Sequence, residues 1–243
     1  MVELLLVTLF GLCIGSFLNV AICRLPKHES IYLPASHCPV CRHSLKWYHN
    51  IPLLSWIFLK GKCAFCHTPI SWQYPLIELL CAAFFAYFYT FTPDTKDALL
   101  LALIFSLLLS LSVIDLRYKA VPDALSLPAL FCSFALFSPL ESLQHGLLFM
   151  GAFSLLRFIL SAITQKEAMG EADIIIAGII GAMLGIKLGF IAIYIAAVLA
   201  LLVFVMLRNR NISLPFIPFL AMGLLITTLC DTTILRIMER LYE

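Results

Sequence analysis

The chain has few charged residues, no repeat at a fixed period and no low-complexity segment. Asp, Glu, Lys and Arg make up 12% of its 243 residues, 62% are hydrophobic, and the mean hydropathy is +1.02. Because a soluble domain has about 25% charged residues, this composition excludes that class and predicts a multi-pass membrane protein. The net charge of only +2 gives no reason to expect a nucleic-acid partner.

The first apolar run lacks two marks of a removed signal peptide. No basic residue precedes it, and no Ala-x-Ala pattern follows it before Arg24 and Lys27. We therefore expect residues 1–23 to remain as a transmembrane helix. Apolar helices of about 17 to 25 residues cross a hydrocarbon layer of roughly 30 Å. We expect an all-α polytopic fold with about eight crossings, at 4–21, 74–91, 98–114, 124–137, 143–163, 174–186, 188–207 and 214–229.

Basic residues are unevenly divided between the two sides of these eight helices. The richer side receives Arg24, Lys27, Arg42, Lys46, Lys60, Lys62, Arg117, Lys119, Lys166, Arg208 and Arg210. The poorer side receives Lys96, Lys187, Arg236 and Arg240. The positive-inside rule makes the richer side cytoplasmic, which puts both termini outside. Asp115 and Asp173 are then expected at the cytoplasmic face.

Residues 24–73 form the one sizeable polar insertion, which we expect to be a small cytoplasmic domain. It contains two Cys-x-x-Cys pairs, Cys38 with Cys41 and Cys63 with Cys66, a spacing similar to that of zinc ribbons. Four thiolates would close a tetrahedral Zn(II) site with no open position, so the metal would be structural. Two disulfides or a redox relay are the alternatives, although lasting disulfides are rare in the cytoplasm. A flanking histidine could also replace one sulfur; the candidates are His37, His43 and His67.

Two carboxylates stand at the ends of uncharged runs. Asp115 follows residues 98–114, and Asp173 precedes residues 174–186. An ionised Asp near the bilayer centre costs about 2.5 to 3.5 kcal/mol, so such residues usually lie at an interface or in a functional cavity. The small residues between 177 and 185 would let their helix approach a neighbour closely and bring Asp173 near Asp115.

A pair of neighbouring carboxyl groups suits acid/base chemistry. Two carboxylates in one site do not easily both ionise, so one keeps a proton while the other accepts one from water. This is the arrangement of an aspartic protease. Alternatively, Asp115 is an interfacial anchor paired with Arg117 or Lys119. For Asp123, which follows a proline and precedes an apolar run, we expect a helix N-cap rather than catalysis.

Several segments resemble the signatures of one family, the bacterial type IV prepilin peptidases, also called leader peptidases and N-methyltransferases. They are residues 15–20, 24–26, 50–55, 74–79, 115–123, 170–173 and 215–219, together with the paired cysteines. Asp115 resembles the family's first catalytic aspartate, and Gly170 to Asp173 resembles its Gly-x-Gly-Asp motif. The chain departs from the family at Ala172 and Ile217, where Gly is usual, and at Ile175, where Lys is common.

The resemblance implies an intramembrane aspartic endopeptidase with Asp115 and Asp173 as catalytic residues. It would cleave the basic leader of type IV prepilins and secretion-system pseudopilins at the cytoplasmic face of the bacterial inner membrane. It also implies a cytoplasmic zinc domain and S-adenosylmethionine-dependent methylation of the new N-terminus. No Gly-rich nucleotide loop follows a predicted strand, so no residue is assigned to the methyl donor. The implied parts are a first helix (1–23), a four-cysteine zinc domain (24–73) and a peptidase domain (74–243).

Glu78 is a further acidic residue, about one turn inside its expected helix. It could bind the basic leader or a substrate amine, or it could form an ion pair with Arg24 or Arg157. A non-enzyme alternative for the whole chain is a transporter or proton relay with a zinc-binding regulatory domain. The absence of repeated halves argues against it. A thiol-redox membrane protein is a third hypothesis, which would require the cysteines to cycle between oxidation states.

Overall fold

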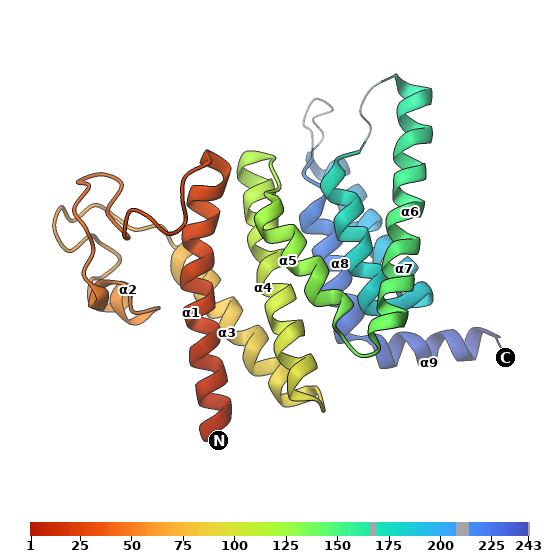
Figure 1. Cartoon of the computed structure of the whole chain (residues 1–243), viewed down its shortest axis with the longest axis horizontal. Helices are drawn as coiled ribbons and strands as arrows, with labels where there is room; N and C mark the ends of the chain where they lie inside the picture. Colours follow the sequence, from red (N-terminus) through yellow and green to blue (C-terminus); the bar gives the residue numbers. More distant parts are fainter. Residues whose placement is uncertain (166–168, 208–213, 243) are drawn as a thin grey trace. The chain divides into compact units, whose positions relative to one another are not determined.

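The computed structural model describes residues 1–165, 169–207 and 214–242 and is helical almost throughout (Figure 1). In the described chain, β-structure is limited to two isolated bridges, His37 with Ser44 and Lys62 with Pro69. The elements are α1 (Val2–Arg24), η1 (Leu25–Lys27), η2 (Trp47–His49), α2 (Leu54–Phe58), α3 (Gln73–Phe91), α4 (Thr95–Tyr118), α5 (Asp123–Phe134), α6 (Pro139–Thr164), α7 (Glu171–Leu207), α8 (Ile217–Leu229) and α9 (Asp231–Tyr242). The predicted all-α membrane fold, with a cysteine-containing insertion between its first two long helices, is confirmed.

Five described helices are long and apolar enough to cross a membrane: α1, α3, α4, α6 and α7. A sixth crossing results if α8 and α9, which are bent by 75° at their junction, are counted as one span. The predicted number of eight therefore stays a prediction. α5 has 12 residues, or about 18 Å of helix, which is shorter than the hydrocarbon layer. Lys166, Arg208 and Arg210, which enter the orientation argument, lie outside the described residues.

α7 contains a break that corresponds to the expected boundary between the sixth and seventh crossings. Gly185 has φ 68° and ψ −168°, outside the helical region, and separates two helical parts of the 37-residue element. A residue with a Cβ would be strained at this positive φ, so glycine allows the break at little cost. The break lies two residues before the predicted boundary at residue 187, and the division of α7 into two crossings stays a prediction.

The first compact unit, Met1–Ile114, is held together by close packing of α1 against α3. A Cβ added to Gly15 would lie 2.7 Å from the Cα of Glu78, so only glycine allows the two backbones to come so close. Ile22, Ile77 and Phe85 are buried around this contact. Such backbone proximity is how helices gain van der Waals contact in lipid, where burial of apolar area gives little driving force.

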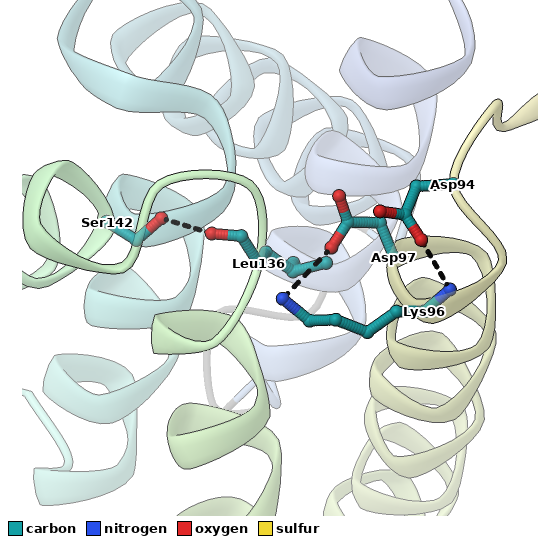
Figure 2. A network of polar contacts seen from close by, with 5 residues as sticks. All are labelled: Asp94, Lys96, Asp97, Leu136 and Ser142. Carbon is teal, nitrogen blue, oxygen red and sulfur yellow. Dashed lines mark hydrogen bonds and ion pairs between the residues drawn. The ribbon is translucent and has the colours of Figure 1, made fainter.

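The turn before α4 is fixed by its own polar groups (Figure 2). The Asp94 carboxylate accepts a hydrogen bond of 2.8 Å from the backbone N–H of Lys96, which satisfies one free donor at the helix start. The Lys96 ammonium forms an ion pair of 3.7 Å with Asp97. In the second unit, the Ser142 hydroxyl donates to the Leu136 carbonyl at 3.1 Å and ties the start of α6 to the preceding turn.

The second compact unit, Asp115–Glu243, packs α7 against α5, α6 and α8. Small residues make these contacts close, as the sequence predicts. A Cβ on Gly181 would lie 2.7 Å from the backbone oxygen of His145 in α6, and one on Gly223 of α8 would overlap the Ala192 carbonyl. α9 then leaves α8 at 75° (Figure 1). The contacts with α5, α6 and α8 therefore fix the position of α7 and of its first turn within this unit.

Candidate active site and metal centre

Asp115 lies in the last turn of α4, where the helix ends. Lys119, one turn further on, has φ 51° and donates its backbone N–H to the Asp115 carbonyl at 3.0 Å, which closes the helix. The Asp115 side chain is 7% exposed, and its Oδ2 accepts a hydrogen bond of 3.3 Å from the backbone N–H of Ile217 at the start of α8. The family's glycine is replaced at this position by Ile217. The replacement does not remove the contact, because the donor is a backbone group.

Asp173 lies in the first turn of α7. Its Oδ2 accepts a hydrogen bond of 3.1 Å from the backbone N–H of Gly170, the reciprocal contact of a capping box. The partial positive charge of a helix N-terminus also favours a carboxylate there. Ala172 is within the helix and is not among the residues with positive φ. Its methyl group therefore brings no backbone strain in place of the family's glycine.

The two aspartates line one cavity of about 430 Å³. Asp115 and Asp173 interact electrostatically within it, so the packing of α7 does bring the two distant segments together. The remaining lining comes from the end of α4, the start of α7 and the segment before α8; these residues are Lys119, Val121, Met169, Gly170, Ala172, Leu214, Pro215, Phe216 and Ile217. A cavity lined by apolar side chains and two carboxyl groups suits a peptide substrate and general acid/base chemistry.

Asp123 differs from its sequence-based expectation by one position. Pro122 is the N-cap of α5 and makes no side-chain capping bond, while Asp123 is the first helical residue. The N-cap prediction is therefore wrong in detail, because the proline itself provides the extended backbone that precedes the helix. A carboxylate in the first turn is still favourable, since it faces the positive end of the helix dipole.

Glu78 is buried in the first unit, with 6% exposure. Its Oε2 accepts a hydrogen bond of 2.8 Å from the backbone N–H of Leu53 just before α2, and Ser16 on α1 is a second hydrogen-bond partner. The predicted ion pair with Arg24 or Arg157 is not found among the described residues. Arg24 donates instead to the Ser30 and Ala35 carbonyls, at 3.0 and 3.5 Å, and Arg157 pairs with Glu171 at 3.2 Å.

The four paired cysteines form one cluster. The Sγ atoms of Cys38, Cys41, Cys63 and Cys66 all lie within 4.8 Å of one another, and those of Cys38 and Cys66 are 3.7 Å apart. Tetrahedral Zn–S bonds of about 2.3 Å would place sulfurs about 3.8 Å apart, so the donor set fits a metal ion. The four cysteines are free thiols in the structure, with no disulfide among them. No histidine belongs to the cluster within the described chain.

Both halves of the cysteine cluster have the same local backbone. In each, the residue after the second cysteine has φ 57° and donates its N–H to the carbonyl of the first: Arg42 to Cys38 at 2.8 Å, and His67 to Cys63 at 3.1 Å. Hydrogen bonds with Thr68 lower the pKa of Cys66 to about 6. For Cys41, a backbone hydrogen bond at His43 lowers the pKa, but burial and hydrogen bonds with the other three sulfurs outweigh it and raise the pKa to about 11. A lowered thiol pKa favours the thiolate form, which is the form that binds metal.

A model described as the bacterial peptidase A24 N-terminal domain matches residues 9–92, which include α1, the cysteine insertion and α3. A model described as the type IV leader peptidase family matches residues 102–205, which include both aspartates of the cavity. No solved structure matches the chain.

Three relatives illustrate the extent of the similarity. A prepilin leader peptidase/N-methyltransferase of Myxococcus xanthus (strain DK1622) is 41% identical over 183 residues, which cover 72% of this chain and 54% of that protein. A type 4 prepilin-like proteins leader peptide-processing enzyme of Escherichia coli O78:H11 is 35% identical over 244 residues, 90% of each chain. A prepilin leader peptidase/N-methyltransferase of Bacillus subtilis (strain 168) is 34% identical over 235 residues, 93% of this chain and 94% of that one. With such similarity along nearly its whole length, the chain belongs to the type IV leader peptidase family.

Proposed function

We propose that this enzyme cleaves the basic leader from type IV prepilins and pseudopilins, with Asp115 and Asp173 as the catalytic residues. The observation that supports this most directly is the shared cavity, in which two carboxyl groups from the ends of apolar helices face one space. Two relatives that cover nearly the whole chain are named for leader peptide processing or prepilin leader peptidase activity. Family membership favours this function over the transporter and thiol-redox alternatives.

The proposed reaction needs one proton shared by the two aspartates. The ionised carboxylate removes a proton from a water molecule while the water oxygen attacks the scissile carbonyl carbon. The protonated carboxyl group donates its proton to the carbonyl oxygen. Collapse of the tetrahedral intermediate then breaks the C–N bond: the newly protonated carboxyl group gives its proton to the leaving amine, and the other carboxylate takes a hydroxyl proton back from the intermediate. The backbone amides of Ile217 and Gly170 orient the two carboxyl groups throughout.

The location of cleavage is proposed from the distribution of charge. The basic residues that flank the expected crossings make the side of Asp115 and Asp173 cytoplasmic. A substrate whose positive leader stays inside would present its leader junction to these residues at the inner membrane. We propose the same three parts as above: a first helix over 1–23, a cytoplasmic four-cysteine domain over 24–73 and the peptidase domain over 74–243.

We propose that the four-cysteine cluster holds a structural Zn(II). Cys38, Cys41, Cys63 and Cys66 would occupy all four positions of a tetrahedron and leave none for a substrate. The insertion around them is small, and a bound metal would supply the stability that its limited core does not. The ion would therefore act on folding, while the hydrolysis takes place at the aspartates.

A second activity is proposed from the relatives' names, which include N-methyltransferase. Methylation of the new N-terminus would use S-adenosylmethionine, a common methyl donor in cells. We assign no residue to this donor. Glu78, which the sequence suggests as a substrate-binding group, has its Oε2 engaged by the Leu53 amide, so we propose a supporting role for it in the first unit.

Replacement of each aspartate by asparagine tests the peptidase proposal. Asp115→Asn and Asp173→Asn keep an oxygen that can accept the amide hydrogen bond but cannot exchange a proton at neutral pH. We expect leader cleavage of a co-expressed tagged prepilin to fall by at least about a thousandfold, as followed by gel mobility and mass spectrometry of the product N-terminus. Asp123→Asn is the matched control and should cleave normally. Normal cleavage by either Asp115→Asn or Asp173→Asn would refute the assignment.

A further inference from the structure

A third ionisable side chain lines the cavity of the two aspartates. Lys119 follows α4 directly, and its ammonium group interacts electrostatically with Asp115. Among the described lining residues it is the one basic side chain. Its backbone is fixed by the positive φ and by the hydrogen bond to the Asp115 carbonyl. Arg117, two residues earlier on the same helix end, does not line the cavity.

The helices that carry the aspartates treat the two carboxyl groups differently. Asp173 is in the first turn of α7, where the helix dipole favours a negative charge. Asp115 is in the last turn of α4, where the dipole opposes one. Each carboxylate also accepts one backbone N–H at a helix start, Asp173 from Gly170 before α7 and Asp115 from Ile217 of α8, so Asp115 lies against one favourable and one unfavourable helix end. Of the two carboxyl groups, only Asp115 is therefore opposed by a negative helix end, that of α4.

The proposed reaction requires more than one fixed location for this proton. The group that acts as base when water attacks must act as acid when the amine leaves. Each carboxyl group must therefore be able to hold the charge at one stage of the cycle. A cation close to Asp115 opposes the effect of the α4 C-terminus, because it favours the charged form of that residue.

We propose that Lys119 is a positioning residue for the catalytic proton. Its ammonium group allows Asp115 to carry the negative charge at one stage of the reaction, while Asp173 carries it at the other. This inference rests on the proposed peptidase function. The titratable groups that face the cavity from the described elements are Asp115 and Lys119 on the α4 side and Asp173 on α7. Glu171, also in the first turn of α7, is paired with Arg157 and so adds little net charge nearby.

The residue at position 175 does not supply a cation to the cavity. The family commonly has a lysine there, but residue 175 is two positions beyond Asp173, and residues two apart on a helix do not share a face. Ile175 is absent from the lining of the cavity in the described structure. Among the described residues, the basic side chain that lines the cavity therefore comes from the end of α4.

The test is the pH dependence of leader cleavage by the full-length protein on a tagged prepilin. Lys119→Met removes the cation, Lys119→Arg keeps it, and Arg117→Met removes a charge from the same helix end outside the cavity. We expect Lys119→Met to move both limbs of the bell-shaped profile to higher pH by about half a unit and to lower the maximal rate several-fold. The two control variants should keep the limbs of the unmodified enzyme. Lys119 is exposed, so the substitution is compatible with folding.

A purely structural role would produce a different result. Lys119→Met would then lower the rate at every pH without moving the limbs, and this outcome would overturn the inference. The same assay includes Asp115→Asn and Asp173→Asn to separate the two proposals. Cleavage by these variants would refute the peptidase assignment itself, whereas inactive aspartate variants with unmoved limbs in Lys119→Met would refute only the role of Lys119.

Discussion

Replacement of Glu78 should loosen the connection between the cysteine insertion and the first two membrane helices. Leu53 has φ 58° and ψ −50°, and the Leu54 N–H donates to the Pro52 carbonyl at 2.6 Å. These values define a γ-turn with positive φ, a rare and strained conformation whose cost is about 1 to 3 kcal/mol. Glu78 accepts the N–H at the centre of this turn. The buried carboxylate therefore helps to hold a backbone shape that the turn would not keep alone.

The expected magnitude follows from the loss of this acceptor. Glu78→Ala leaves the partly buried Leu53 amide without its side-chain acceptor, which costs about 1 to 3 kcal/mol. That energy corresponds to a 5- to 150-fold larger population of the open turn, roughly. Glu78→Gln keeps a side-chain oxygen for the amide, and the Ser16 hydroxyl can rotate to accept from the new NH₂ group. We expect Glu78→Gln to resemble the unmodified protein.

Hydrogen exchange followed by mass spectrometry, in detergent micelles, measures this opening at residues 50–58. Glu78→Ala should exchange faster there by the factor given above, while the α6–α8 region, which belongs to the other unit, should be unchanged. Unaltered exchange in Glu78→Ala would refute the structural role. If Glu78→Gln also kept normal exchange but lost leader cleavage, the charge of Glu78 would instead be needed by the substrate.

Three further predictions concern packing, metal and lipid. Gly223→Ala should destabilise the protein by about 1 to 3 kcal/mol because its methyl group meets backbone, whereas Gly151→Ala, with nothing within 4 Å, should be neutral or stabilising in thermal unfolding. Cys63→Ser should lower the zinc content measured by elemental analysis and increase proteolysis of residues 24–73, and an unchanged zinc content would contradict the tetrathiolate site. α9 is amphipathic and bends away from an apolar helix, with Ile234 on its apolar face and Arg236 on the opposite one. A tryptophan at Ile234 should therefore be quenched by brominated lipids and one at Arg236 should not; equal quenching would argue against an interfacial helix.

The sequence predicted those features that depend on residue type and spacing. The apolar runs located the long helices, since a membrane requires an uninterrupted hydrogen-bonded segment of sufficient length. The cysteine spacing predicted the four-sulfur cluster that the structure assembles. Small residues between 177 and 185 predicted close helix packing, and that packing does place Asp173 in one cavity with Asp115.

Other features could not be predicted from the residue types and their spacing. The amides that hold the carboxylates, from Ile217 and Leu53, belong to the backbone, so the identity of those residues does not mark them as partners. The γ-turn at Leu53 is equally hidden, because leucine does not favour positive φ and only the tertiary contact keeps it there. The number of crossings is also difficult to predict, since α5 is apolar but short.

The hydrogen bond between Asp115 and Ile217 has a consequence for how this protein could lose its activity during evolution. It joins segments 102 positions apart, and one partner is also a proposed catalytic group. A descendant that no longer needed to cut peptides would still need an oxygen atom there to keep α8 in place. Degenerate copies of such a protein should therefore carry asparagine at this site more often than alanine, and they would persist as folded pseudoenzymes.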